Sequence, residues 1–355
     1  MTSQAAIPII IVGYNNPGDI AACLRALSAA LPEPAFDIII CENGGPAAYQ
    51  NLVCALLDTS GPGVIAERAP AAAAFAVQGF LNLATLRLAG RDSTIMIGQA
   101  AENLGYAGGI NIWLRVLLDE RMWRAAWPGV WILNPDTEPA PAALLEMVTY
   151  AALSGKGMIG ARIMANGDAG RIHSRGLAWR RMHASTLAVD YHASARYEPD
   201  ARALEARLDA PSGAAVYVTR ACLQSIGLMD ERYFLYFEDL DWGLRAKATC
   251  GIGYAWRAVI RHRGGTTIGS TASRATRSPL AVYLDFRNRI LFVRQWFPGW
   301  LPWTVAMLAL RALEFAAVGS WRHTQTAYRG LWAGVRGEVG RPGFLDGHDQ
   351  RRARR

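Results

Sequence analysis

Four short apolar runs in the first half of the chain alternate with helix-forming stretches, and this alternation restricts the possible folds more than any other feature. The runs cover residues 7–14, 36–41, 93–99 and 130–133. Continuous apolar strands with helices between them are typical of a parallel sheet that helices cover on both faces. We therefore predict an α/β fold for this half of the chain.

Each predicted strand is followed at once by a polar or glycine-rich segment. The segments begin near Asn15, Glu42, Asn103 and Asn134. In parallel sheets, ligands bind outside the carboxyl ends of the strands. The position of the four segments therefore predicts a ligand site at that edge of the sheet.

The second half of the chain is less regular. Its pattern predicts further strands, a hairpin region, a helix that begins near Glu238, a polar loop or linker, another helix and a last apolar stretch. In chain order these are strand 158–163, hairpin region 173–190, strand 213–219, the helix near Glu238, strand 253–261, loop 264–278, helix 281–295 and apolar stretch 296–318.

Asp136 and His262 are candidate metal ligands. Asp136 follows Pro135 just beyond a predicted strand end, where a carboxylate can bind a divalent cation together with a diphosphate. Asn-Pro-Asp is also an ordinary turn. His262 lies at another strand end, and a lone histidine is either a ligand through a ring nitrogen or, more often, structural.

Three acidic residues, Glu238, Asp239 and Asp241, follow an aromatic run at the start of a predicted helix. Acids in a first helical turn complement the helix dipole. The functional alternative is that one carboxylate faces a cleft and takes a proton from an attacking hydroxyl.

The segment Asn103-Leu-Gly-Tyr-Ala-Gly-Gly lets a backbone approach a phosphate or a sugar closely. Its glycine spacing differs from the dinucleotide pattern GxGxxG, so it does not predict a dinucleotide site.

These segments, in this order, resemble the bacterial family 2 glycosyltransferases, in particular their rhamnosyltransferase-like subgroup. The resemblance runs from about Ile7 to Gly265 and extends more faintly through 283–298. It rests on the motifs Val12-Gly-Tyr-Asn, Cys41-Glu-Asn-Gly-Gly, Asn103-Leu-Gly-Tyr-Ala-Gly-Gly, Leu133-Asn-Pro-Asp-Thr-Glu, Ser212-Gly-Ala, Gly227-Leu-Met-Asp-Glu-Arg-Tyr-Phe-Leu-Tyr-Phe-Glu-Asp-Leu-Asp and His262-Arg-Gly-Gly.

The resemblance implies a GT-A fold, with a Rossmann-like, mixed but mainly parallel sheet, and inverting transfer from a nucleoside-diphosphate sugar. It implies a divalent metal, Mg²⁺ or Mn²⁺, held by Asp136 and His262, with Asn134 in place of the first acid of the family's metal motif. Asp239 matches the general base, and Glu238 is the second candidate.

The resemblance also assigns residues to the two substrates. Glu42 stands where the family usually has aspartate. The nucleotide-sugar site would comprise Tyr14, Asn15, Glu42, Asn43, Asn103, Gly105, Gly108, Gly109, Asn134 and Asp136, and the acceptor side Ser212, Gly213 and Asp241.

The C-terminal part of the chain is strongly basic. Residues 256–355 contain 17 arginines, no lysine and 5 acids, a net charge of +12, whereas the preceding 255 residues carry −4. This asymmetry indicates an anionic partner or a solvated arginine-rich face.

The tryptophan-rich stretch 296–321 lies within this basic part. It contains Arg311 and Glu314, and its apolar run is shorter than the ~20 residues of a spanning helix. It either lies at a membrane interface or packs on the domain. We favour binding to an anionic membrane surface.

The five cysteines show no CxxC spacing and no even framework, which argues against structural zinc and a disulfide scaffold and fits a reducing cytosol. The apolar run 7–12 is interpreted as a strand and not as a signal peptide. The expected location is therefore cytoplasmic, peripheral at the inner face of the cell membrane.

We predict a GT-A domain over 1–265, with a nucleotide-sugar half (1–136) and an acceptor half (137–265), and a helical appendage over 266–355. The predicted activity is transfer of a hexose or deoxyhexose, with rhamnose from a dTDP donor as one candidate, to a glycan or polyprenyl-linked acceptor of cell-surface polysaccharide synthesis. The alternatives are a UDP- or GDP-sugar donor and a catalytically silent glycan- or lipid-binding module. Nucleic-acid binding is not expected, because no such motif is present.

Overall fold

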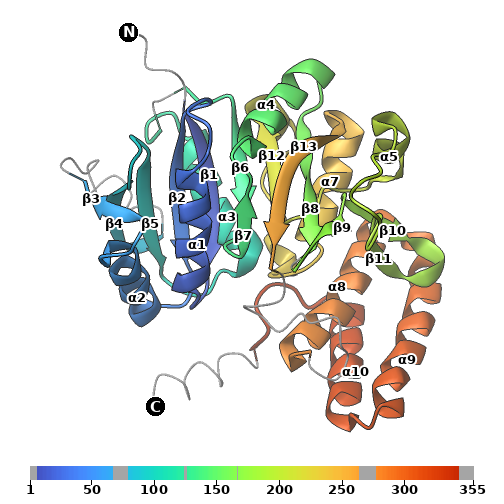
Figure 1. Cartoon of the computed structure of the whole chain (residues 1–355). Coiled ribbons are helices and arrows are strands. Elements are labelled where there is room, and N and C mark those ends of the chain that lie inside the picture. Colours follow the sequence, from blue (N-terminus) through green and yellow to red (C-terminus); the bar gives the residue numbers. More distant parts are fainter. Residues whose placement is uncertain (1–5, 67–78, 124–125, 166, 264–276, 344–355) are drawn as a thin grey trace.

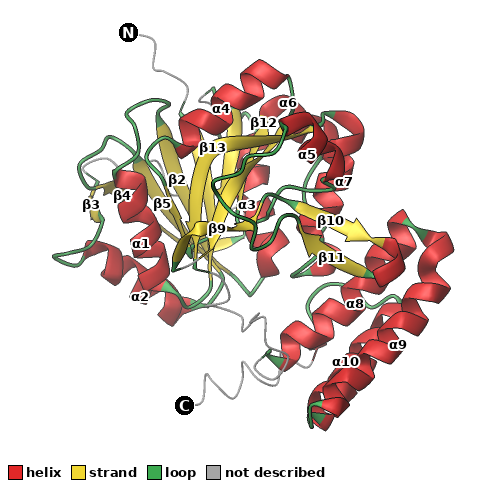
Figure 2. Ribbon diagram, turned by 45° about the vertical axis from the view of Figure 1, so that its right-hand side comes forward, coloured by secondary structure: helices red, strands yellow, loops and turns green. Residues whose placement is uncertain are grey.

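The structure is a computed structural model that describes residues 6–66, 79–123, 126–165, 167–263 and 277–343 (Figure 1). A central sheet is covered by helices on both faces, and three helices gather below one end of it (Figures 1 and 2).

The central sheet has eleven strands, in the order β3-β4-β5-β2-β1-β6-β12-β8-β13-β7, with β9 paired to β8. A separate hairpin joins β10 to β11. The strands are β1 Ile7–Gly13, β2 Phe36–Glu42, β3 Gly63–Ile65, β4 Phe80–Leu88, β5 Thr94–Ala100, β6 Gly129–Leu133, β7 Thr137–Pro139, β8 Met158–Ala165, β9 Asp168–Ser174, β10 Leu177–Arg180, β11 Ser185–Ala188, β12 Ala215–Thr219 and β13 Ile252–His262.

The four apolar runs of the first half form β1, β2, β5 and β6, and they pair in parallel, as predicted. Strand β12 runs antiparallel to both of its neighbours, β6 and β8, so the second half makes the sheet mixed. The fold class predicted from the sequence is confirmed.

Helices cover both faces because every central strand is apolar on both sides. Side chains of α1, α2 and α4 pack on one face, and those of α3, α6 and α7 pack on the other. These helices, together with the short α5, are α1 Pro17–Ser28, α2 Pro46–Leu57, α3 Gly105–Leu118, α4 Ala143–Ser154, α5 Ala201–Arg207, α6 Arg220–Ile226 and α7 Glu238–Thr249.

The insertion between α2 and β5 contributes two edge strands that the sequence does not predict. Strand β4 pairs antiparallel with β5, and β3 pairs with β4. Much of β4 is exposed or half-buried, so it lacks the continuous apolar run that marks the central strands. Residues 67–78 of the insertion lie outside the described part.

The C-terminal helices are α8 (Pro279–Trp296), α9 (Leu301–Ala317) and α10 (Trp321–Arg336). The sequence predicts α8 and the apolar α9 but not α10. In the described part of the chain, no helix is long and apolar enough to cross a membrane. The predicted loop over 264–278 falls almost entirely outside the described residues, as does the predicted boundary at residue 265, so the division into domains stays a prediction.

Two of the cysteines correct the expectation of a fully reduced set. Cys222 and Cys250 form a disulfide, with their Cα atoms 5.6 Å apart. The sequence gives no sign of this pair, because 28 residues separate them and only the packing of α6 beside the end of α7 brings them together. Cys23, Cys41 and Cys54 are free thiols.

Leu24 and Leu153 test where the core lies. Leu24 on α1 is fully buried, whereas Leu153 on α4 is 83% exposed. We expect Leu24→Ala to lower the free energy of unfolding by about 2–5 kcal/mol, because it leaves a cavity. Leu153→Ala should change it by less than about 0.5 kcal/mol. Chemical denaturation of both variants measures the difference, and equal effects would contradict the described core.

Candidate functional site

The predicted nucleotide-binding residues meet at the carboxyl ends of β1 and β2. Glu42 ends β2, is fully buried, and accepts hydrogen bonds from the backbone N–H groups of Asn15 (3.2 Å) and Gly44 (2.8 Å). Burial raises the pKa of Glu42, and these two hydrogen bonds oppose the rise. Glu42 therefore organises the loops after both strands. Tyr14 lies in the first loop, where its N–H donates to the side chain of Asn16 (2.9 Å).

Asn43 joins the β2 loop to the glycine-rich segment. Its amide donates to the carbonyl oxygen of Gly105 (2.8 Å), and its side-chain oxygen accepts from the N–H of Leu104 (3.4 Å). Asn103 accepts from the N–H of Gly105 (3.0 Å). Asn43 and Asn103 thus hold the segment where α3 begins.

The glycines of this segment have a packing reason of their own. Gly105 has φ +70°, and a Cβ there would lie 2.1 Å from the carbonyl oxygen of Phe234. A Cβ on Gly109 would lie 2.8 Å from Val12. Gly108 is likewise buried, against Leu104. Close packing of α3 accounts for these glycines, and their contact with a donor stays a prediction.

The two predicted metal ligands face each other. His262, the last residue of β13, has its Nε2 3.1 Å from Oδ1 of Asp136, which follows β6. The main-chain oxygen of Asp136 also accepts from the N–H of Arg263 (3.0 Å). Residues 126 positions apart meet here because β7, which follows Asp136 directly, pairs antiparallel with the end of β13. The backbone N–H of Asn134 donates a hydrogen bond to the carbonyl oxygen of Ala214 (2.9 Å).

His173 is a neighbour of this pair that the sequence does not single out. It lies on β9, and its ring centroid is 5.5 Å from that of His262 in an edge-on arrangement. Burial lowers the pKa of His173, and the nearby rings of His262 and His192 lower it further. The neutral form is therefore favoured beside the Asp136–His262 pair. The only sequence feature that included His173 was the predicted hairpin region 173–190.

Glu238 and Asp239, at the start of α7, have different surroundings. Glu238 is only 3% exposed, whereas Asp239 is half-buried and lies against Gly213. Burial raises the pKa of both carboxyls, and the charge of Asp239 raises that of Glu238 further. Of the two, Asp239 is the more exposed carboxyl.

The backbone before these acids adopts an unusual conformation. Phe234, Tyr236 and Phe237 have φ angles of +64°, +70° and +79°, although none is glycine. Such left-handed residues cost about 1–3 kcal/mol each unless their surroundings hold them. The segment 233–237 is therefore a strained loop that sets the start of α7.

Two buried residues of α8 hold this strained loop. The side-chain nitrogen of Asn288 lies 2.9, 2.7 and 2.9 Å from the carbonyl oxygens of Tyr233, Leu235 and Tyr236. Arg287 donates to the carbonyl of Tyr233 as well (2.9 Å). Both residues are fully buried. Sequence reasoning missed them, because an Arg-Asn pair inside a helix carries no motif of its own.

Tyr106 connects the two halves of the site. Its hydroxyl donates to the carbonyl oxygen of Gly213 (2.8 Å). Its pKa is raised by burial and then by the charges of Glu238, Asp239 and Asp136. The three carboxylates therefore all act on the ionisation of this phenol. The sequence motif contained Tyr106, but our site prediction did not include it.

The predicted acceptor residues divide into two kinds. Ser212 and Gly213 precede β12 next to Asp239. Asp241 is buried, and its oxygens bind Arg245 (2.9 Å), Gln295 (2.9 Å) and Trp296 (2.8 Å). Asp241 therefore joins α7 to the end of α8. We leave it out of the proposed acceptor site.

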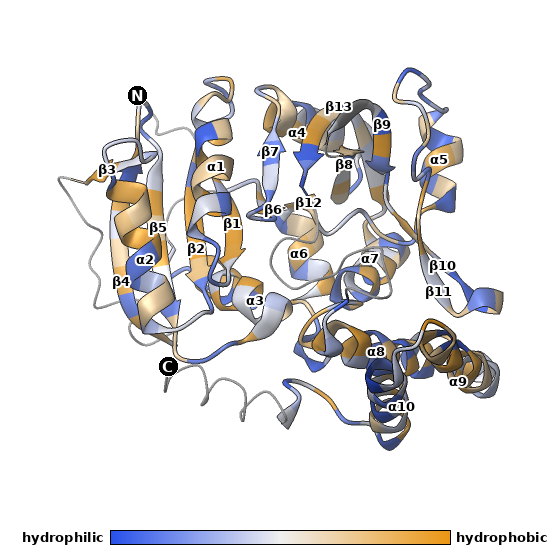
Figure 3. Cartoon of the chain, turned by 60° about the horizontal axis from the view of Figure 1, so that its bottom comes forward, coloured by the Kyte–Doolittle hydropathy of each residue, from blue (hydrophilic) through white to orange (hydrophobic). Residues whose placement is uncertain are grey.

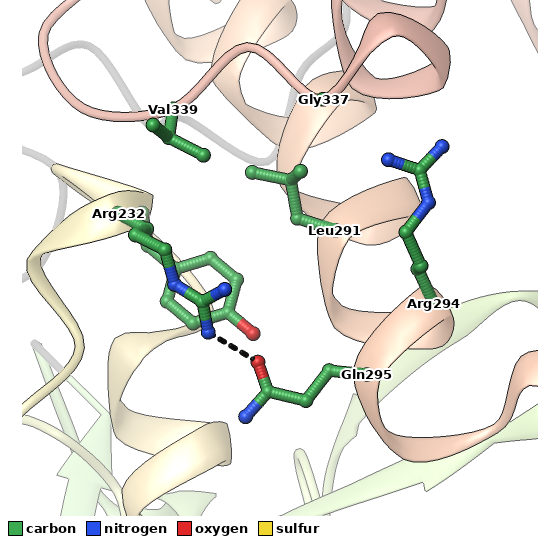
Figure 4. A pocket seen from close by; sticks show the side chains of 7 residues that line it. Arg232, Leu291, Arg294, Gln295, Gly337 and Val339 are labelled. Carbon is green, nitrogen blue, oxygen red and sulfur yellow. Dashed lines mark hydrogen bonds between the residues drawn. The ribbon is translucent and has the colours of Figure 1, made fainter.

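A cavity of about 350 Å³ lies outside this site. Figure 4 shows Arg232 on one side of it, next to Val339, facing Leu291, Arg294 and Gln295 of α8. Gln295 accepts from Arg232 (2.7 Å) and donates to Asp241. None of the predicted site residues lines this cavity.

No family model matches the chain. A low-salt glycan biosynthesis hexosyltransferase, Agl10, of Haloferax volcanii is 24% identical over 259 residues, 68% of this chain and 75% of the relative. An N-acetylglucosaminyl-diphospho-decaprenol L-rhamnosyltransferase of Mycobacterium tuberculosis is 26% identical over 328 residues, 86% of this chain and 91% of the relative.

Solved structures give the fold. A structure of GalNAc-T7 with UDP, GalNAc and Mn²⁺ superposes with a TM-score of 0.54 at 11% identity, over 84% of this chain and about half (49%) of the other. The GT-A fold predicted from the sequence is confirmed. The predicted kinship with the family 2 glycosyltransferases is also confirmed, at the level of the family.

Asn288 tests how the strained loop is held. We expect Asn288→Ala to lower the free energy of unfolding by about 1–3 kcal/mol, because buried carbonyl oxygens lose their donor. Hydrogen exchange of the Leu235 and Leu240 amides should speed up more than that of amides in β1.

The matched control is Asn82→Ala. Asn82 makes one side-chain hydrogen bond, to Gln99 (2.7 Å), at the far edge of the sheet. This variant should leave exchange in the loop unchanged. If Asn288→Ala did not speed up exchange in the loop, the role assigned to α8 would be wrong.

Proposed function

We propose that the protein is a metal-dependent, inverting glycosyltransferase. It transfers a hexose or deoxyhexose from a nucleoside-diphosphate sugar to a glycan or polyprenyl-diphosphate-linked acceptor. The observation that carries the proposal is that Asp239 lies against Gly213, to which Tyr106 donates, while His262 faces Asp136. One carboxylate serves the leaving diphosphate and the other serves the attacking hydroxyl.

Asp239 is the proposed general base. Direct displacement inverts the configuration of the anomeric carbon. It needs a base on the face of the sugar opposite the leaving group. Asp239 accepts the proton of the acceptor hydroxyl, and its raised pKa strengthens it as a base. Backbone N–H groups, first that of Leu240 (2.8 Å), stabilise the ionised carboxylate and limit the rise in its pKa.

The Asp136–His262 pair fits a divalent cation. Adjacent ligands of an octahedral ion with bonds of about 2.1 Å lie about 3.0 Å apart, and Asp136 Oδ1 lies 3.1 Å from His262 Nε2. In the described part of the chain no group of three or more His, Cys, Asp or Glu forms a metal site. Diphosphate oxygens and water would complete the shell, and the bound ion would neutralise charge on the leaving diphosphate.

The acceptor proposal draws on the relatives and on the basic C-terminal third. The mycobacterial relative is named for a decaprenol-diphosphate-linked acceptor. We propose the same class of acceptor here, with rhamnose among the candidate sugars, and action as a peripheral protein at the cytoplasmic membrane surface. A nucleotide-sugar donor and a divalent metal ion are the other expected partners.

Asp239→Asn tests the base. We expect this variant to lower kcat by a factor of about 10²–10⁴, because the acceptor proton loses its base, while donor binding persists. Glu238→Gln should lower kcat much less, because Glu238 is buried away from substrate. A radiolabelled sugar-transfer assay measures both, and wild-type turnover by Asp239→Asn would refute the assignment.

The same assay gives a pH prediction. The base works only when ionised, and the pKa of Asp239 is raised. As pH falls, kcat should therefore decline at a higher pH than an ordinary aspartate, of pKa about 3.9, would cause. A rate that stays constant down to pH values near that ordinary pKa would contradict the buried environment of Asp239.

Thermal unfolding tests the donor and the metal. Nucleotide sugars that bind the native fold raise its melting temperature, so a panel with UDP, GDP and dTDP donors identifies the donor class. We expect the shift to require Mn²⁺ or Mg²⁺ and to fall sharply in His262→Ala. His183→Ala, which alters a histidine of the β10–β11 turn, is the control. If the melting temperature of the folded protein rises with none of the nucleotides, the binding-module alternative is favoured.

A further inference from the structure

The outward side of α10 carries a row of arginines. Arg322, Arg329 and Arg336 are all exposed and follow one another at intervals of seven residues, which places them on one side of the helix. The sequence of α10 contains no acidic residue. Figure 3 shows hydrophilic residues along this helix, beside the more hydrophobic α9.

These three arginines have no ion pair in the described part of the chain. Two arginines of neighbouring α8 differ, since Arg287 lies 3.9 Å from Glu338 and Arg289 lies 2.8 Å from Asp285. The charge on the outer side of α10 is therefore not neutralised within the described chain.

Large aromatic side chains lie beside the arginines. Trp321 is 68% exposed and Trp332 is 59% exposed, and the guanidinium of Arg336 lies 6.0 Å from the centre of the Trp332 ring. We call Trp321, Arg322, Arg329, Trp332 and Arg336 the arginine–tryptophan face. Exposed tryptophans without a protein partner mark contact surfaces.

An apolar stripe on α9 continues this face. Leu310 and Leu313 are 62% and 49% exposed, with Ala306 and Ala317 in line with them. Tyr328 of α10 donates to the carbonyl oxygen of Ala309 on α9 (3.0 Å), which joins the two helices. The α9–α10 hairpin points away from the central sheet (Figure 1), and the outward residues of both helices are exposed.

Two tryptophans of the stretch 296–321, first considered for membrane contact, do not contribute. Trp296 donates to buried Asp241, and Trp300 packs with Phe292 and Phe297. Those two residues attach α8 and α9 to the rest of the protein, whereas Trp321, in the same stretch, starts α10 and is exposed.

We propose that the arginine–tryptophan face, with the α9 stripe, docks on an anionic lipid bilayer. This inference rests on the proposed function, whose lipid-linked acceptor lies in such a bilayer. Arginines meet lipid phosphates, tryptophans lie at headgroup level, and α10 lies parallel to the surface. A second copy laid symmetrically on the same face would instead bring arginines against arginines.

Vesicle co-sedimentation tests the proposal. The protein should bind phosphatidylcholine vesicles only when they contain phosphatidylglycerol. Replacing all three arginines by glutamine (R322Q, R329Q, R336Q) should lower the partition coefficient on the order of 100-fold, since each arginine near an anionic surface contributes roughly a factor of five. Replacing Trp321 and Trp332 by alanine should weaken binding as well.

The matched control removes three other exposed arginines that also lack an ion pair in the described chain: R121Q, R196Q and R202Q. This control variant loses the same number of positive charges as the α10 variant, and it should bind anionic vesicles almost as tightly as the wild type. Equal losses in both triple variants, or no loss in the first, would overturn the proposal. So would a dimer in sedimentation velocity that W321A and W332A dissociate, because the face would then be a protein interface.

Donor binding separates this inference from the proposed function. The R322Q, R329Q, R336Q variant should keep the nucleotide-dependent rise in melting temperature. If the wild type bound anionic vesicles without any nucleotide shift, the docking face would stand and the transferase proposal would fail. If the shift were present but vesicle binding were absent, only the docking face would fail.

Discussion

The hydrogen bonds from Asn288 and Arg287 to the loop before α7 are the interaction on which the site depends. They hold three non-glycine residues in left-handed conformations that cost about 1–3 kcal/mol each. Because Glu238 and Asp239 follow that loop directly, their position is fixed from α8. Helix α8 is thus part of the proposed catalytic site and not only an attachment to the domain.

The two carboxylates of the site, Asp136 and Asp239, come from different elements of the fold. The Asp136–His262 pair lies at the meeting of β6, β7 and β13, whereas Asp239 starts α7. Tyr106 of α3 lies between them and donates to Gly213. In the proposed mechanism, this arrangement gives one carboxylate to the metal while burial makes the other more basic.

The C-terminal hairpin gives the charge asymmetry of the chain a structural meaning. On α8, Arg287 is buried and Arg289 half-buried, and both pair with carboxylates, so these two act within the fold. The arginines on α10 are exposed and, in the described chain, unpaired, so they act outward. The same residue type therefore serves two purposes, and burial decides which.

The sequence by itself determined the α/β class, the central strands and the edge of the sheet that carries the site. It did so because apolar periodicity and strand-end motifs are local signals. It also singled out Asp136, Asp239 and His262, whose motifs are compact. The edge strands β3 and β4, the Cys222–Cys250 bond and the role of Asn288 were decided only by tertiary structure. Each depends on contacts between residues far apart in the chain, and such contacts leave no local pattern to read.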